Sequence, residues 1–163
     1  MLNKVLVSAI AAMIVVMVAP AGADSVFISD ARDAGGKLDI RSYQVSKGGG
    51  VLYLKQCMHR PFYDDDLAGG NHLTADLRIT NRDGYVVTTT FRGLRLRGWL
   101  IPYLDGKVKP RLGLRVKVDR LNSRCVESVI PRSQVWTQGA LRLDTRLTSF
   151  YEGTTDSTPL PTR

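Results

Sequence analysis

Alternation of apolar and basic residues in the stretch KVKPRLGLRVKVD, residues 107–119, constrains the fold of this chain more than any other feature. Successive side chains of a β-strand point to opposite faces of the sheet, so this pattern predicts a strand with one buried and one wet face. A helix would need apolar residues three or four positions apart. Pro110 has no amide hydrogen, which places the start of the predicted strand at a sheet edge or a bulge.

The same two-residue period recurs along the chain. Strand-like runs occur in SVFIS, KLDIRSYQVS, GVLYLKQCMH, HLTADLRITN, YVVTTTF, GLRLRGWLIPYL and GALRLDTRLTSFY. Asp83-Gly84 and Asp105-Gly106 each predict a tight hairpin turn, because these residues tolerate positive φ. PRSQVWTQG predicts one short helical turn at most. We therefore predict an all-β fold, an antiparallel, jelly-roll-like β-sandwich of about eight or nine strands.

The first residues have the pattern of a secretory signal. Lys4 precedes the apolar run VLVSAIAAMIVVMVAP, and AGA precedes Asp24 as a cleavage site. The alternative is a retained membrane anchor, but the run is shorter than the roughly 20 residues that a span needs. We predict a cleaved signal over residues 1–23, a domain over 24–152 and a flexible Thr/Pro-rich tail over 153–163. The mature protein would be a monomer without a membrane span, secreted or associated with the cell envelope.

Cysteine content and charge limit the chemistry of the predicted domain. Cys57 and Cys125 are the only cysteines. An oxidising compartment favours a disulfide between them, with buried free thiols as the alternative. Of the 23 basic residues only Lys4 lies in the predicted signal, which leaves 22 basic against 15 acidic residues, a net charge of +7. Such a chain attracts polyanions, although the charge is also compatible with solubility alone.

An acidic stretch, SDARDAGGKLDIRS, opens the predicted domain. Asp30, Asp33 and Asp39, with carbonyl groups from the turn at Gly35-Gly36, offer the oxygen ligands that Ca²⁺ prefers. One interpretation is a structural cation site, and no other cofactor is indicated. The alternative is an Asx-type turn, with Asp39 as an outward residue of a strand. The spacing is not that of a known calcium loop.

The polar faces of the predicted strands carry many basic residues and one tryptophan. If those strands are neighbours in one sheet, they form a positive ligand surface of Arg95, Arg97, Trp99, Lys109, Arg111, Arg115 and Lys117. Anionic glycans or envelope polymers are ligands that such a surface would attract. Nucleic acid is not favoured as a partner, because bases need several interleaved aromatic side chains on which to stack.

The loop HRPFYDDDLAGGNH, residues 59–72, holds both histidines beside three consecutive aspartates. A catalytic or metal site there would combine His59 or His72 with Asp64, Asp65 and Asp66. The alternative is a solvated loop, because the spacing matches no known zinc-hydrolase or EF-hand motif. We predict no enzymatic activity, and two alternatives stay open: a secreted hydrolase that uses this loop, and a purely structural envelope protein.

Several of these segments occur together in a known group of proteins. The leader, DARDAGGKLDIRS, the hairpin SKGGG, the strand LTADLRITNRDGYVV and the late ESVIPRSQV resemble small exported bacterial β-sandwich proteins of unknown function. These proteins are similar in outline to jelly-roll carbohydrate-binding and DOMON-like domains. The resemblance implies a β-sandwich with a non-enzymatic role. The sequence therefore predicts an exported binding or interaction module whose ligand is a glycan or a polyanionic envelope polymer.

Overall fold

The structure, a computed structural model, describes residues 25–34, 36–78, 82–135 and 146–158. The predicted secretory signal, residues 1–23, lies outside these ranges. The described residues form eleven strands and three short 3₁₀ helices: β1 (Ser25–Ser29), β2 (Ile40–Gly48), β3 (Val51–Met58), η1 (Asp64–Leu67), β4 (His72–Arg78), β5 (Gly84–Phe91), β6 (Leu96–Leu104), β7 (Lys107–Val108), η2 (Pro110–Leu112), β8 (Leu114–Asn122), β9 (Cys125–Pro131), η3 (Arg132–Gln134), β10 (Arg146–Tyr151) and β11 (Thr154–Ser157).

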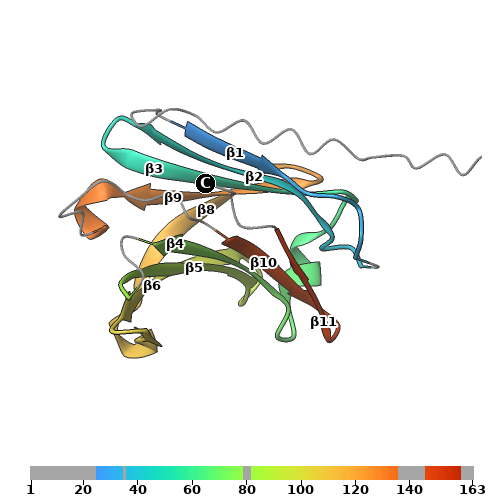
Figure 1. Cartoon of the computed structure of the whole chain (residues 1–163). Coiled ribbons are helices and arrows are strands. Elements are labelled where there is room, and N and C mark those ends of the chain that lie inside the picture. Colours follow the sequence, from blue (N-terminus) through green and yellow to red (C-terminus); the bar gives the residue numbers. More distant parts are fainter. Residues whose placement is uncertain (1–24, 35, 79–81, 136–145, 159–163) are drawn as a thin grey trace, which may run out of the picture.

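All strand pairs are antiparallel, and the strands form one continuous sheet in the order β1-β2-β3-β9-β8-β6-β5-β4-β10-β11, with β7 paired to β6. The sheet curls into a half-barrel, so that β1, β2, β3 and β9 lie over β4, β5 and β10 (Figure 1). The predicted all-β antiparallel class is confirmed. The strand count of eight or nine is wrong, and the division into two sheets of a sandwich is not confirmed, since the ladder of strand pairs runs without a break.

Strand β8 makes the bend between the two walls of the half-barrel. Its first residues, Leu114 to Val116, pair with β6, and its later residues, from Lys117, pair with β9. The nine residues of β8 thus form part of both walls, because one end of the strand pairs with β6 and the other end pairs with β9. The strands β6 and β8 diverge beyond the pair of Gly98 and Val116, and this divergence opens the groove described below.

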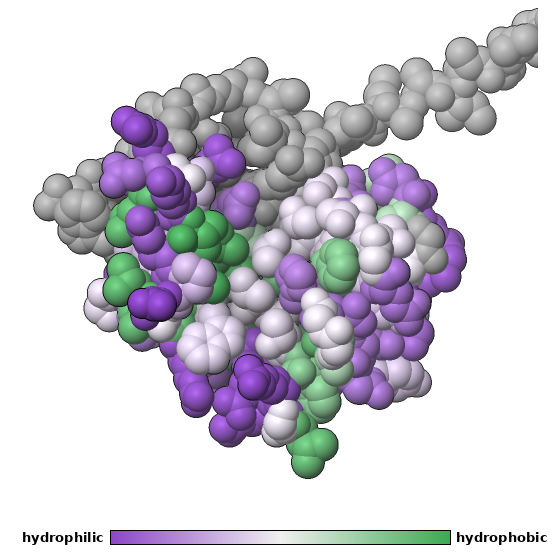
Figure 2. Space-filling view, turned by 90° about the horizontal axis from the view of Figure 1, so that it is seen from below, coloured by the Kyte–Doolittle hydropathy of each residue, from purple (hydrophilic) through white to green (hydrophobic). Residues whose placement is uncertain are grey.

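The core lies inside the half-barrel and is built by the predicted alternation. On β4, Leu73, Ala75 and Leu77 are fully buried, while Thr74 and Asp76 between them are partly exposed. Leu54 and Leu100 fill the same interior from the facing walls. Each large apolar side chain buried in this way stabilises the fold by roughly 1.5–3 kcal/mol. The lower wall seen from outside is mostly hydrophilic, with hydrophobic residues in small separate groups (Figure 2).

Three local predictions about the backbone need correction. The single strand predicted over residues 108–118 is interrupted by η2, because Pro110 cannot donate a ladder hydrogen bond and starts a 3₁₀ turn instead. Residues 154–157, predicted as part of a flexible tail, form β11, which pairs with the outer edge of β10. The tight turn predicted at Asp83-Gly84 does not form, because Gly84 is already part of β5 and pairs with Arg78.

Among the described residues, no helix is long and apolar enough to cross a membrane.

Candidate functional site

A basic groove opens on the half-barrel where β6 and β8 diverge. It has a volume of about 250 Å³, and four cationic side chains line it: Arg95, Arg97, Arg115 and Lys117. Arg97 and Trp99 alternate with the buried Gly98 and Leu100, so the two-residue period of β6 sends both toward the outside of the sheet. Gly98 has a packing role, because a Cβ atom there would lie 2.6 Å from the methyl groups of Val116 and Val118.

Positive charge in this groove is concentrated rather than balanced. Within the described part of the chain, Arg95, Arg97 and Arg115 form no ion pair with an acid, whereas Lys117 contacts Asp119 at 2.6 Å. Loss of hydration, followed by the charges of Arg95, Arg115 and Arg92, lowers the pKa of Arg97. An anion that enters the groove would relieve this repulsion among like charges.

Trp99 lies beside the basic groove and also borders a second one. The guanidinium of Arg115 lies over its indole ring, with Cζ 5.3 Å from the ring centroid, in a cation–π contact. The two residues are directly opposite each other in the paired strands β6 and β8. The second groove is lined by Trp99, Arg92, Asn71 and neighbouring residues of β5 and the 69–71 loop. Trp99 therefore presents an aromatic surface between cationic and amide side chains, which is an arrangement suited to a sugar or another polar ring.

Lys109 and Arg111, which the sequence placed on the same surface, do not line this groove. Lys109 follows β7, and Arg111 lies in η2, at the end of β6 that is remote from Arg97. The interruption at Pro110 is the cause, because it ends the alternation that would have kept these residues in line with Arg115. Arg92, which the sequence analysis did not single out, lies at the β5–β6 turn, where its carbonyl accepts a hydrogen bond from Nε of Arg97 at 2.9 Å.

An acidic cluster forms away from the basic groove, between the loop after β1 and strand β11, the two ends of the sheet. Carboxylate oxygens of Asp30, Asp33 and Asp156 all lie within 4.8 Å of one another. Asp30 and Asp33 follow β1, and Asp156 belongs to β11. Sequence reasoning missed Asp156 because it assigned this residue to the tail. TTDS has no alternation of apolar and polar residues, and the strand preference of its two threonines was the one local signal for β11.

Asp39 lies next to this cluster but does not point outward, as the Asx-turn alternative required. Its exposed fraction is 1 %, and the strand begins only at the following residue, Ile40. Neither carboxylate oxygen of Asp39 has a hydrogen-bond partner among the described residues. The nearest cation is Arg32, whose Nε lies 4.0 Å from Oδ2. Three consecutive residues, Leu38, Asp39 and Ile40, are all buried, which a strand with one wet face does not allow.

Burial and the charges of neighbouring aspartates disfavour the charged forms of Asp30 and Asp156. Burial, followed by the charge of Asp156, raises the pKa of Asp30 from 3.8 to about 6. Burial, followed by the charges of Asp33 and Asp39, raises the pKa of Asp156, although the backbone N–H of Ile40 donates to its Oδ2 at 2.7 Å. The other groups around Asp30 are Arg32, beside Asp39, and His59, whose Nε2 lies 3.2 Å from the Asp30 carbonyl oxygen.

These shifts predict how stability depends on pH in metal-free buffer. The unfolded chain releases the Asp30 proton near pH 3.8, whereas the folded chain holds it until about pH 6. The folded state therefore binds more protons in this interval, so the free energy of unfolding falls as pH rises from about 4 to about 6. Urea unfolding at several pH values measures this slope. The variant Asp30→Asn should lose part of it, and equal slopes for both proteins would contradict the prediction.

Among the described residues, the acidic loop, residues 59–72, does not gather His59 or His72 with its aspartates into one metal-ligating group. Asp64 forms an ion pair with Arg120, and Asp66 contacts Lys37 at 2.9 Å and accepts the backbone N–H of Tyr63 at 2.7 Å. His72 stacks on Phe150, with ring centroids 5.4 Å apart. Since His59 faces the Asp30 carbonyl instead, the two histidines lie in different surroundings. Asp64 and Asp66 thus hold the loop to neighbouring residues.

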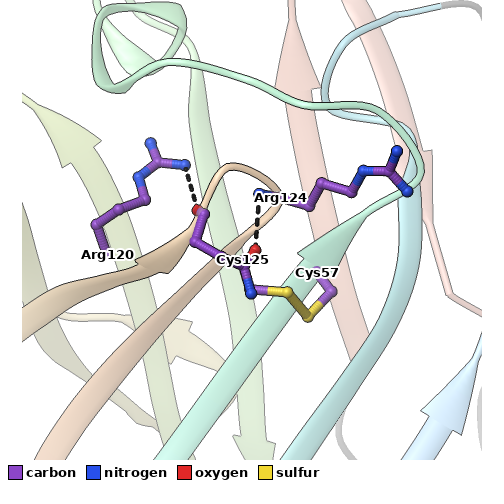
Figure 3. The surroundings of a disulfide bond; sticks show 5 residues. Cys57, Arg120, Arg124 and Cys125 are labelled. Atoms are coloured by element: carbon purple, nitrogen blue, oxygen red, sulfur yellow. Dashed lines mark hydrogen bonds between the residues drawn. A yellow bond between two sulfur atoms is a disulfide. The ribbon is translucent and has the colours of Figure 1, made fainter.

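The predicted disulfide is confirmed. Cys57 and Cys125 are bonded, and they are directly opposite residues of neighbouring strands, β3 and β9. The bond closes the end of this strand pair beside the β8–β9 turn, where the N–H of Arg124 donates to the Asn122 side chain at 2.9 Å (Figure 3). The disulfide is thus structural and lies outside both grooves.

Comparisons of this chain with protein-family models, with curated proteins and with solved structures found no match.

Proposed function

We propose that this protein is an exported, non-enzymatic module that binds an anionic glycan or another polyanionic envelope polymer in the basic groove. The observation that carries the proposal is the convergence of Arg95, Arg97, Arg115 and Lys117 on one groove beside Trp99. Guanidinium groups bind carboxylate, sulfate and phosphate by paired hydrogen bonds. An open groove between strands suits a chain that passes along the surface, and the aromatic ring offers a stacking surface for a sugar.

Binding to heparin, a soluble sulfated glycan, tests this proposal. The variant Arg97→Gln/Arg115→Gln should lose at least about tenfold in affinity at low salt, because each lost charge-assisted contact contributes about 1.5–3 kcal/mol. Added salt should weaken the wild-type complex more steeply than that of the variant. Binding to immobilised heparin at increasing NaCl concentrations, with thermal melting to confirm folding, measures both effects.

The matched control is Lys109→Gln/Arg111→Gln, which removes the same charge outside the groove. If the groove is the site, this control elutes from heparin close to the wild type. Equal losses for both double variants would mean that only net charge matters, and the groove proposal would then be wrong. Binding to neutral dextran should be absent, since dextran has no anionic group with which the arginines could pair.

One observation favours a second candidate function, docking on an anionic lipid surface. Leu94 is 92 % exposed at the tip of the β5–β6 turn, with a left-handed φ of 62°, between Arg92 and Arg95. Basic residues around a projecting apolar side chain suit an interface with acidic lipid headgroups. Co-sedimentation with phosphatidylglycerol vesicles, compared between the wild type and Leu94→Ser, separates this candidate from glycan binding, which the substitution should leave unchanged.

A further inference from the structure

The acidic cluster has the geometry of a shared ion site. Two oxygens that bind one Ca²⁺ at about 2.4 Å can lie at most about 4.8 Å apart. Oxygens of Asp30, Asp33 and Asp156 satisfy this limit pairwise. The three side chains come from the loop after β1 and from β11, which are far apart in the sequence. The fold, rather than a local turn, therefore brings the three acids together.

Asp39 supplies an independent sign that a cation belongs here. Its side chain is fully buried, and both of its oxygens lack a hydrogen-bond partner among the described residues. Burial of an unpaired carboxylate costs several kcal/mol unless a positive charge compensates it. Arg32 at 4.0 Å is one counter-charge, and its own side chain is 59 % exposed. One exposed guanidinium leaves most of the negative charge of four neighbouring aspartates unbalanced. Oδ2 of Asp30 is likewise buried without a partner.

We propose that Asp30, Asp33 and Asp156, supported by Asp39, bind a divalent cation of the Ca²⁺ type. The donors are all carboxylate oxygens, which hard cations prefer over softer transition metals. Both cysteines are held in the disulfide, and His59 faces a backbone carbonyl rather than the carboxylates. The cation site shares no residue with the basic groove, so its test does not depend on the proposed glycan binding.

The position of the cluster assigns the cation a structural role. Strands β1 and β11 are the two ends of the sheet order. Two hydrogen bonds already join the segment at the start of β2 to β10 and β11: the N–H of Ile40 donates to Asp156, and the hydroxyl of Ser149 donates to the Leu38 carbonyl at 2.6 Å. Without a cation, ionised aspartates repel one another at this junction. With one, the same charges hold the two ends of the half-barrel together.

Thermal melting of the protein, stripped with EDTA and titrated with CaCl₂, tests the site. At a calcium concentration about 100 times Kd, the melting temperature should rise by roughly 5–10 °C. Asp33→Asn should weaken calcium binding at least about tenfold, because it removes one anionic ligand. Asp33 is exposed, and its side chain accepts no hydrogen bond from another described residue, so this variant should still fold. Asp65→Asn, an exposed acid outside the cluster, is the matched control and should respond as the wild type does.

Asp39→Asn gives a result that a merely structural aspartate would not produce. In EDTA this variant should melt above the wild type, because a buried charge whose one counter-charge among the described residues is the exposed Arg32 is replaced by a neutral group. In CaCl₂ its gain in melting temperature should be smaller than that of the wild type. Amide hydrogen exchange provides the second measurement, since calcium should slow exchange at Ile40 and in β11. A melting temperature unmoved by Ca²⁺, Mg²⁺ or Mn²⁺, or an undiminished response in Asp33→Asn, would overturn the proposal.

Discussion

Loss of the Cys57–Cys125 disulfide is expected to lower the free energy of unfolding by about 4 kcal/mol. The two cysteines are 68 residues apart, so the bond removes a large part of the freedom of the unfolded chain. The chain-entropy relation gives about 4 kcal/mol for a loop of this length. For a domain of this size, the melting temperature should fall by roughly 10 °C or more. Urea unfolding of Cys57→Ala/Cys125→Ala against the oxidised wild type measures the difference.

Reduced wild-type protein is the control for this comparison. It has the same sequence as the oxidised protein, so any loss it shows cannot come from the altered side chains. The reduced protein and the double variant should lose similar stability. Mass spectrometry that finds two free thiols in the purified protein, or unfolding curves that do not move on reduction, would contradict the prediction.

The substitution Gly84→Ala is expected to destabilise the protein by about 3 kcal/mol, at the upper end of the usual cost of overpacking. A Cβ atom at this position would lie 2.3 Å from the backbone oxygen of Leu77 and 3.0 Å from Cα of Arg78. Both are backbone atoms of β4, which cannot turn aside as a flexible side chain can. The pairing of β4 with β5 must therefore shift, and with it the buried residues Leu77 and Val87.

Gly48→Ala is the matched control for this prediction. Gly48 ends β2 and is exposed, and among the described residues the one atom within 4 Å of an added Cβ is in Tyr53, at an ordinary contact distance of 3.8 Å. Alanine there should be neutral or stabilise the protein slightly, because it restricts the unfolded chain. Chemical unfolding of the two variants compares them directly. Similar costs at both positions would show that the close approach of β4 and β5 is not what fixes Gly84.

Local pattern identified the strands well, because it reports a property of each segment by itself. Residues of SVFIS form β1, and HLTADLR forms β4 with Leu73, Ala75 and Leu77 on its buried face. Asp105-Gly106 forms a tight turn in which both residues have positive φ, at 52° and 76°. The same dipeptide at Asp83-Gly84 behaves differently. Its turn signal was overridden by the strand pairing, which uses the missing side chain of Gly84 to let two backbones approach.

The sequence by itself determined that this chain forms antiparallel strands with basic outer faces, because a two-residue period depends only on residues that are neighbours in the sequence. Only the tertiary structure decided which charges meet. Bending of β8 between two walls gathers Arg97 and Arg115 into one groove, while the turn at Pro110 leaves Arg111 outside it. Curling of the sheet brings Asp156 to Asp30 across the length of the chain. Both contacts, between the arginines and between the aspartates, depend on how the whole sheet curls. The spacing of residues within one segment does not determine how the sheet curls.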